Sequence, residues 1–211
     1  LRCANECRTA LSEFRLMNTL APADRLRIHA FLPRSRANGP GWRAVIWTQG
    51  CSIRCPGCFN PHTHDPAGGN TVAVSELFSQ IMALGDSIEG ITISGGEPFD
   101  QAQPLARLLA QVRTATSLSA ILFTGHSYDT VMSLPQADRV LGCLDVLISG
   151  PYQPLHVSHR TVLLGSWKTL HVLTSRYSES DLTCLPDAEV IINSNASVDL
   201  TGFQVGASRN E

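Results

Sequence analysis

The sequence predicts an α/β fold in which a curved, mainly parallel sheet forms a shortened partial (βα) barrel. Short apolar segments with strand character alternate with segments whose apolar residues recur at helical spacing, and this alternation is typical of parallel strands joined by helical crossovers. Only 16% of the 211 residues are charged and 43% are hydrophobic, which favours many buried strands. A complete eight-fold barrel takes about 250 residues, so we expect a shortened one.

The first half of the chain contains three expected strands and one expected helix. Segments 27–31 and 43–49 are expected to be strands, and they are joined by a polar turn that reads Asn38-Gly39-Pro40-Gly41. Residues 72–84 carry apolar side chains at helical spacing and therefore predict a helix. Residues 90–94 read Gly-Ile-Thr-Ile-Ser and predict a buried strand.

The second half continues the same alternation. A helix is expected over 105–112, with Pro104 in its first turn, where the missing N–H of proline costs little. Two short segments, 189–192 and 197–200, flank a polar turn and predict a terminal hairpin. Three further strands are expected, at 120–124, 144–149 and 171–174.

We expect a single folded domain over residues 25–203, with an extension over 1–24 before it and a tail over 204–211 after it. The net charge of −2 gives no electrostatic basis for nucleic-acid binding. No apolar run reaches the roughly 18 residues that a membrane-spanning helix requires. No segment reads as a secretion signal, so we expect a cytoplasmic protein whose thiols stay reduced.

Three cysteines lie in one short loop, which reads Cys51-Ser-Ile-Arg-Cys55-Pro-Gly-Cys58. We call residues 51–58 the cysteine loop. Three thiolates can ligate three irons of an iron–sulfur cluster and leave the fourth iron open to another ligand. The alternative is a zinc site, in which His62 or His64 would complete a set of three cysteines and one histidine.

A glycine turn follows the strand expected at 90–94 and reads Gly95-Gly96-Glu97-Pro98. Two glycines at the end of a strand let a ligand approach the backbone closely and leave amides free to bond it. The carboxylate of Glu97 can accept hydrogen bonds from an ammonium group. Because the carboxyl ends of parallel strands meet at one rim, the cysteine loop and the glycine turn are expected to converge there.

The two motifs together resemble those of the radical S-adenosylmethionine enzymes. The resemblance extends over roughly residues 25–175 and is greatest to the small activating enzymes of anaerobic ribonucleotide reductase and pyruvate formate-lyase. The segments that carry it are Trp47-Thr-Gln-Gly-Cys51, Cys58-Phe-Asn60, Gly90-Ile-Thr-Ile-Ser-Gly-Gly-Glu-Pro98, Phe123-Thr-Gly-His-Ser-Tyr128 and Leu144-Asp-Val-Leu-Ile-Ser-Gly150.

The resemblance implies a partial barrel of the radical S-adenosylmethionine type, with a [4Fe–4S] cluster and S-adenosylmethionine as cofactors. It implies three cluster ligands, Cys51, Cys55 and Cys58. It implies that the cofactor is cradled by Gly95, Gly96 and Glu97. Hydrogen bonds to the carboxylate or ribose of the cofactor are expected from Thr124, Ser149 and Ser166, each of which could instead be an ordinary loop hydroxyl.

The resemblance also implies the reaction. The reduced cluster would cleave S-adenosylmethionine to a 5′-deoxyadenosyl radical, which abstracts a hydrogen atom, and no catalytic residue beyond the cluster ligands is expected. The expected hydrogen donor is a glycine of a partner glycyl-radical enzyme that contacts loops within 149–166, and the expected reductant is a flavodoxin or ferredoxin. The alternatives are a small molecule or short peptide as the target, and a non-catalytic iron–sulfur electron carrier.

Two features leave the target open. The family's Arg-Gly-Ser segment reads Leu164-Gly165-Ser166 here, so the arginine is missing. The extension carries a second pair of cysteines, Cys3 and Cys7, whose role the sequence does not assign.

Overall fold

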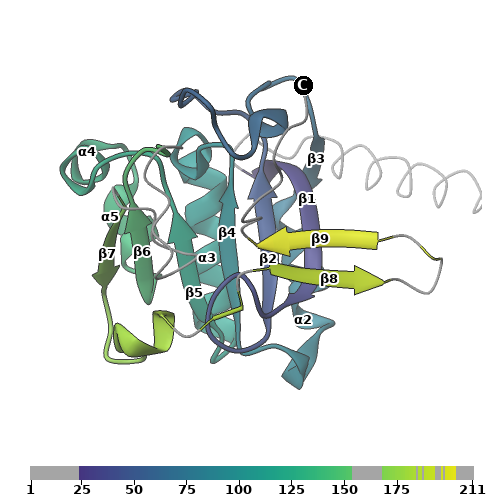
Figure 1. Cartoon of the computed structure of the whole chain (residues 1–211). Coiled ribbons are helices and arrows are strands. Elements are labelled where there is room, and N and C mark those ends of the chain that lie inside the picture. Colours follow the sequence, from purple (N-terminus) through teal and green to yellow (C-terminus); the bar gives the residue numbers. More distant parts are fainter. Residues whose placement is uncertain are drawn as a thin grey trace, which may run out of the picture.

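The computed structural model describes residues 24–153, 168–183, 185–186, 188–192, 196 and 198–202. Its centre is a seven-stranded sheet with the order β3-β1-β2-β4-β5-β6-β7, and a separate two-stranded sheet pairs β8 with β9 (Figure 1). The predictions for the extension, for the tail, for Leu164 to Ser166 and for most of the 149–166 loops lie outside the described residues.

The strands begin and end as follows: β1 (Arg25–Ser35), β2 (Arg43–Thr48), β3 (Asn70–Ala73), β4 (Gly90–Gly95), β5 (Ser119–Phe123), β6 (Val146–Ser149), β7 (Thr169–Val172), β8 (Ala188–Ile192) and β9 (Val198–Gly202). The helices are α2 (Val74–Met82), α3 (Ala102–Ala115), α4 (Tyr128–Ser133) and α5 (Ala137–Leu141). Single turns of 3-10 helix lie at Pro61–Thr63, Gly85–Ser87, Pro98–Gln101 and Ser180–Leu182.

The sheet is parallel only at its centre. Strands β2, β4, β5 and β6 run parallel to one another, as the βαβ pattern predicts. Strands β1, β3 and β7 each pair antiparallel with their neighbours, so the expected mainly parallel sheet is in fact mixed. One reason is plain at β1, because the turn between β1 and β2 is too short for a crossover and a short turn joins antiparallel strands. Strands β3 and β7 form the two edges of an open sheet.

The element predictions hold best where the pattern is local. The strands expected at 27–31, 43–49, 90–94 and 120–124 are confirmed, and so is the hairpin near the end of the chain. The helix expected from residue 72 starts at Val74, because the preceding residues pair with β1 as strand β3. The helix with Pro104 in its first turn is confirmed and extends further at both ends.

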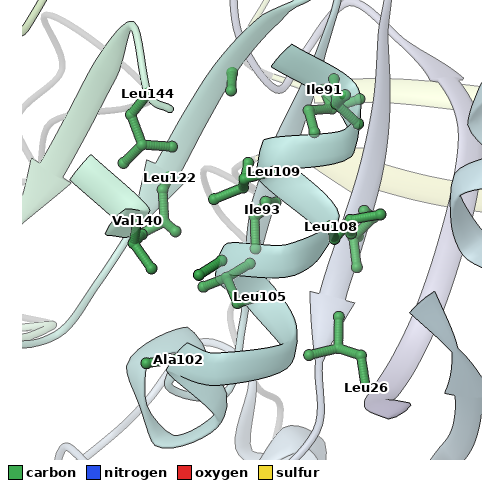
Figure 2. Close-up of a cluster of buried hydrophobic side chains, with 14 of the residues drawn as sticks. Leu26, Ile91, Ile93, Ala102, Leu105, Leu108, Leu109, Leu122, Val140 and Leu144 are labelled. Carbon is green, nitrogen blue, oxygen red and sulfur yellow. The ribbon is translucent and has the colours of Figure 1, made fainter. Parts of the chain in front are cut away.

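Helices cover one face of the sheet and form the main core with it. Figure 2 shows the α3 side chains Leu105, Leu108 and Leu109 among side chains of the strands. Leu105 and Leu108 are fully buried, and Ile91 and Ile93 of β4 belong to the same cluster. Within the described residues, no helix is long and apolar enough to cross a membrane.

The opposite face of the sheet is filled by side chains at one end and hollow at the other. At the amino end of β2, the fully buried Arg43 donates hydrogen bonds to the Thr92 hydroxyl at 2.7 Å, the Ser119 hydroxyl at 2.9 Å and the Tyr177 hydroxyl at 3.2 Å. These bonds tie three parallel strands together and fill this end. The other end is left hollow, and hairpin β8–β9 crosses in front of β1 and β2 (Figure 1).

Replacing Leu105 with alanine tests the core. The change leaves a cavity beneath the parallel strands, so it is expected to lower the free energy of unfolding by about 2–5 kcal/mol. Chemical denaturation monitored by circular dichroism measures this. Gln111→Ala, an exposed change on the same helix, is the control and is expected to shift stability by no more than about 0.5 kcal/mol. Equal effects of the two variants would contradict this description of the core.

Candidate cofactor site at the carboxyl ends of the parallel strands

Loops that follow the parallel strands meet around one cavity of about 790 Å³. The cysteine loop follows β2, the glycine turn ends β4, and Thr124 follows β5, as the convergence argument predicts. The cavity also extends along β1 to Val198 and Leu200 of the hairpin. The two sequence motifs therefore belong to one site.

Backbone and side-chain bonds on both sides hold the cysteine loop. The N–H of Gly50 donates to the carbonyl of Thr63 at 2.8 Å, and the N–H of Cys51 donates to the carbonyl of His64 at 3.3 Å. The backbone N–H and the hydroxyl of Ser52 both donate to the carboxylate of Asp100, each at 2.7 Å. Asp100 is a positioning residue that no local sequence pattern indicated, because its partner lies 48 positions away.

The three thiols of the cysteine loop are free, half-buried and turned to the cavity. Burial raises the pKa of the Cys58 thiol, and the N–H of Asn60, 3.4 Å from that sulfur, acts in the opposite direction. Sulfur donors of this kind suit iron–sulfur clusters, in which each thiolate holds a different iron. By the chemistry of its donors, this loop fits a cluster with three protein ligands.

A zinc ion is the alternative occupant of this loop. Across the described residues, no three His, Cys, Asp or Glu side chains are placed to hold one metal ion. His64 lines the cavity, and its Nε2 is a buried atom without a hydrogen-bond partner in the described part of the chain. This nitrogen therefore has bonding capacity left for a molecule in the cavity.

The glycine turn packs directly on the start of the cysteine loop. A β-carbon on Gly96 would collide with the carbonyl oxygen of Gly50, so only glycine fits there. The N–H of Gly96 donates to Thr48 O and the N–H of Glu97 to Gly50 O, both at 2.9 Å. The amides of Gly96 and Glu97 are therefore spent on joining the two loops, which corrects the expectation of free amides for Gly96.

Glu97 is a buried link between the loops after β4 and β5. Its carboxylate accepts hydrogen bonds from the N–H of Phe99 at 2.9 Å, the N–H of Gly125 at 2.8 Å and the hydroxyl of Thr124 at 2.9 Å. Burial raises the pKa of Glu97, although these donors work against the shift. The side chain therefore joins the two loops and forms part of the cavity wall.

The predicted hydroxyl ligands are placed differently from one another. Thr124 lines the cavity, but its hydroxyl donates to Glu97 and accepts from the N–H of His126 at 3.1 Å. Ser149 is buried and its hydroxyl pairs with Nε2 of His171 at 2.9 Å, while Tyr128 stacks on that imidazole. Ser166 lies outside the described residues.

Lys168 lines the cavity and was not predicted as a site residue. Its ammonium donates to the carbonyl of Gly150 at 2.8 Å and to the carbonyl of Thr124 at 3.4 Å. Burial lowers the pKa of Lys168, and the nearby Cys55, Glu97 and Cys58 partly offset this. A lysine between a tryptophan and a strand carries no local motif, so nothing in the linear sequence points to it.

The sequence matches the model of one protein family, described as the 4Fe-4S single cluster domain, over residues 37–169. This range contains the cysteine loop, the glycine turn and the loops after β5 and β6. The match supports the iron–sulfur alternative over zinc.

Three similar proteins span this chain to different extents. The pyruvate formate-lyase-activating enzyme of Clostridium pasteurianum is 33% identical over 48% of this chain and 44% of its own. The anaerobic ribonucleoside-triphosphate reductase-activating protein of Enterobacteria phage T4 is 29% identical over 57% of this chain and 78% of its own. The anaerobic ribonucleoside-triphosphate reductase-activating protein of Vibrio cholerae is 31% identical over 60% of this chain and 84% of its own. This chain therefore spans less than half of the first relative and most of the other two.

The variant Gly96→Ala tests the contact between the two loops. The added methyl group forces Gly50 and the neighbouring Cys51 apart from the turn, so we expect a loss of about 1–3 kcal/mol in stability and less iron bound on reconstitution. Denaturation and iron analysis measure the two effects. Gly142→Ala is the matched control, because its φ of −62° suits any residue and its added β-carbon would lie 3.1 Å from the carbonyl oxygen of Asp138, a much milder contact than at Gly96. Normal stability and iron content in Gly96→Ala would show that the loops do not touch there.

Proposed function

We propose that this chain, which belongs to the 4Fe-4S single cluster domain family, is a radical S-adenosylmethionine activating enzyme whose target is a glycine of a partner glycyl-radical enzyme. The observation that carries the proposal is the joining of a three-cysteine loop and a glycine turn at one cavity. The relatives are named as activating enzymes of pyruvate formate-lyase and of anaerobic ribonucleoside-triphosphate reductase. These names support a glycyl-radical enzyme as the partner.

The residues of this chain would bind the cofactors. Cys51, Cys55 and Cys58 would hold the cluster and leave one iron for S-adenosylmethionine. When bound, the reduced cluster supplies the electron that cleaves S-adenosylmethionine and so yields a 5′-deoxyadenosyl radical. The glycine turn, which lines the cavity, would lie against the cofactor, whose cationic amino group needs hydrogen-bond acceptors such as backbone carbonyl oxygens.

The far end of the cavity favours a polypeptide as the target. Four apolar side chains of hairpin β8–β9 share one face, and all remain at least 50% exposed: Val190, Ile192, Val198 and Leu200. We call them the apolar quartet. Two of them also line the cavity that contains the three cysteines. An exposed apolar face at the mouth of a site suits contact with another protein better than capture of a small polar metabolite.

The cluster is the first part of the proposal to test. Anaerobically reconstituted protein should be brown and hold about four irons per chain. Alanine at Cys51, Cys55 or Cys58 should abolish both the colour and the iron, because each removes one iron ligand. Cys143→Ala changes a free cysteine away from the cavity and should retain both. Stoichiometric zinc without iron-dependent absorption would contradict the assignment.

The target requires a separate test with a glycyl-radical subunit from the same genome. Incubation with that subunit, S-adenosylmethionine and dithionite should give a persistent glycyl-type doublet in the electron paramagnetic resonance spectrum. Leu200→Ser should lower the radical yield about ten-fold, since a buried leucine contributes about 1.5–3 kcal/mol, and should affect cofactor cleavage without the partner much less. Val172→Ser, an exposed valine on edge strand β7, is the matched control.

Two results would reject the glycine target. The first is the absence of the doublet together with cofactor-dependent change of a small molecule or peptide, which favours the biosynthetic alternative. The second is a cluster that never cleaves S-adenosylmethionine, which favours an electron carrier. The flavodoxin or ferredoxin expected as reductant stays a prediction.

A further inference from the structure

Lys168 supplies a positive charge at an otherwise nearly neutral cavity wall. Among the described residues that line the cavity, it is the only lysine or arginine, and Glu97 is the only carboxylate. No ion pair among the described residues includes Lys168. Its charge is therefore not cancelled by a direct partner in that part of the chain.

The direction of β7 brings Lys168 to this wall. Strand β7 runs antiparallel to β6, and Thr169 lies opposite Ser149, so the residue before β7 lies beside the loop that leaves β6. In a parallel arrangement the same residue would lie at the other end of the sheet. The topology thus places Lys168 on the rim that carries the cysteine loop.

The ammonium is held in place with bonding capacity to spare. It donates to Gly150 O at 2.8 Å and to Thr124 O at 3.4 Å, which anchors it to the loops after β6 and β5. An ammonium group has three donors, so one can point toward whatever fills the cavity. Carbonyl oxygens orient the group but leave its full charge.

Lys168 lines the same cavity as the three cysteines of the proposed cluster site and Glu97. Cys55, Glu97 and Cys58 all raise the pKa of Lys168, in agreement with this shared position. A cluster with three thiolate ligands is negative overall and gains one more negative charge on reduction. In a partly buried site, salt and water screen the attraction less than at the surface.

We propose that Lys168 acts on the cluster through its charge. The ammonium stabilises the negative charge that the cluster gains on reduction. This inference rests on the proposed function. In the step concerned, one electron passes from an external reductant, dithionite in the test, to the oxidised cluster, and no proton or bond is transferred. The charge raises the reduction potential, because net charge and hydrogen bonds around a cluster are what set it.

A redox titration of the reconstituted full chain, without S-adenosylmethionine, tests the proposal. Electron paramagnetic resonance reports the fraction of reduced cluster at each potential. In Lys168→Met and Lys168→Gln the ratio of reduced to oxidised cluster at a given potential should fall about ten-fold, which is 59 mV for a one-electron couple. Lys168→Arg keeps the charge and should stay close to the parent protein. Arg139→Met, which removes an exposed charge on α5, is the control.

The variants separate charge from hydrogen bonding. Glutamine can still donate to Gly150 O, so a normal potential in Lys168→Gln with a shifted one in Lys168→Met would assign Lys168 a structural role and overturn the proposal. Unchanged potentials in both would also overturn it. If Lys168→Met binds no iron, the comparison of Lys168→Gln with Lys168→Arg decides. A parent protein that assembles no cluster would instead reject the proposed function.

Discussion

The site depends on the close contact between the end of β4 and the start of the cysteine loop. Two backbone hydrogen bonds of 2.9 Å join these segments, and the missing side chain of Gly96 lets them approach. The contact links residues almost fifty positions apart and leaves little freedom for either loop. Asp100, which follows the glycine turn, extends the link through its two bonds to Ser52. The segment from Gly96 to Asp100 thus holds the cysteine loop through both backbone and side-chain hydrogen bonds.

Two buried carboxylates, those of Glu97 and Asp145, link further segments of the sheet to one another. The carboxylate of Glu97 connects the glycine turn to the loop after β5 through three donors. At the opposite, amino ends of the parallel strands, the buried Asp145 accepts from the N–H of Ala120 at 2.9 Å and from the Thr174 hydroxyl at 2.7 Å, which connects β5 to the segment after β7. Each carboxylate is satisfied by groups of different segments, so Glu97 ties loops together at the carboxyl ends of the strands and Asp145 does the same at their amino ends.

Two cations, the buried Arg43 and the half-buried Lys168, show how surroundings decide a role. Arg43 meets hydroxyl and carbonyl oxygens on every side, with bonds to Ile91 O at 2.6 Å and Pro40 O at 3.1 Å besides those to Thr92, Ser119 and Tyr177. Its donors are used up, so it serves the fold. Lys168 has two carbonyl partners and faces a cavity, so its charge remains for a ligand.

Local sequence was enough to predict most of the strands, the terminal hairpin, the three clustered cysteines and the glycine turn. Each depends on residues close together in the chain, and the rule that parallel strands share a carboxyl-end rim predicted that the loops meet. Only the tertiary structure decided which polar groups face the cavity. Glu97 and Thr124 satisfy each other, and antiparallel pairing of β7 moved Lys168 to the rim. These outcomes depend on hydrogen bonds and strand pairings between distant segments, which a local pattern does not encode.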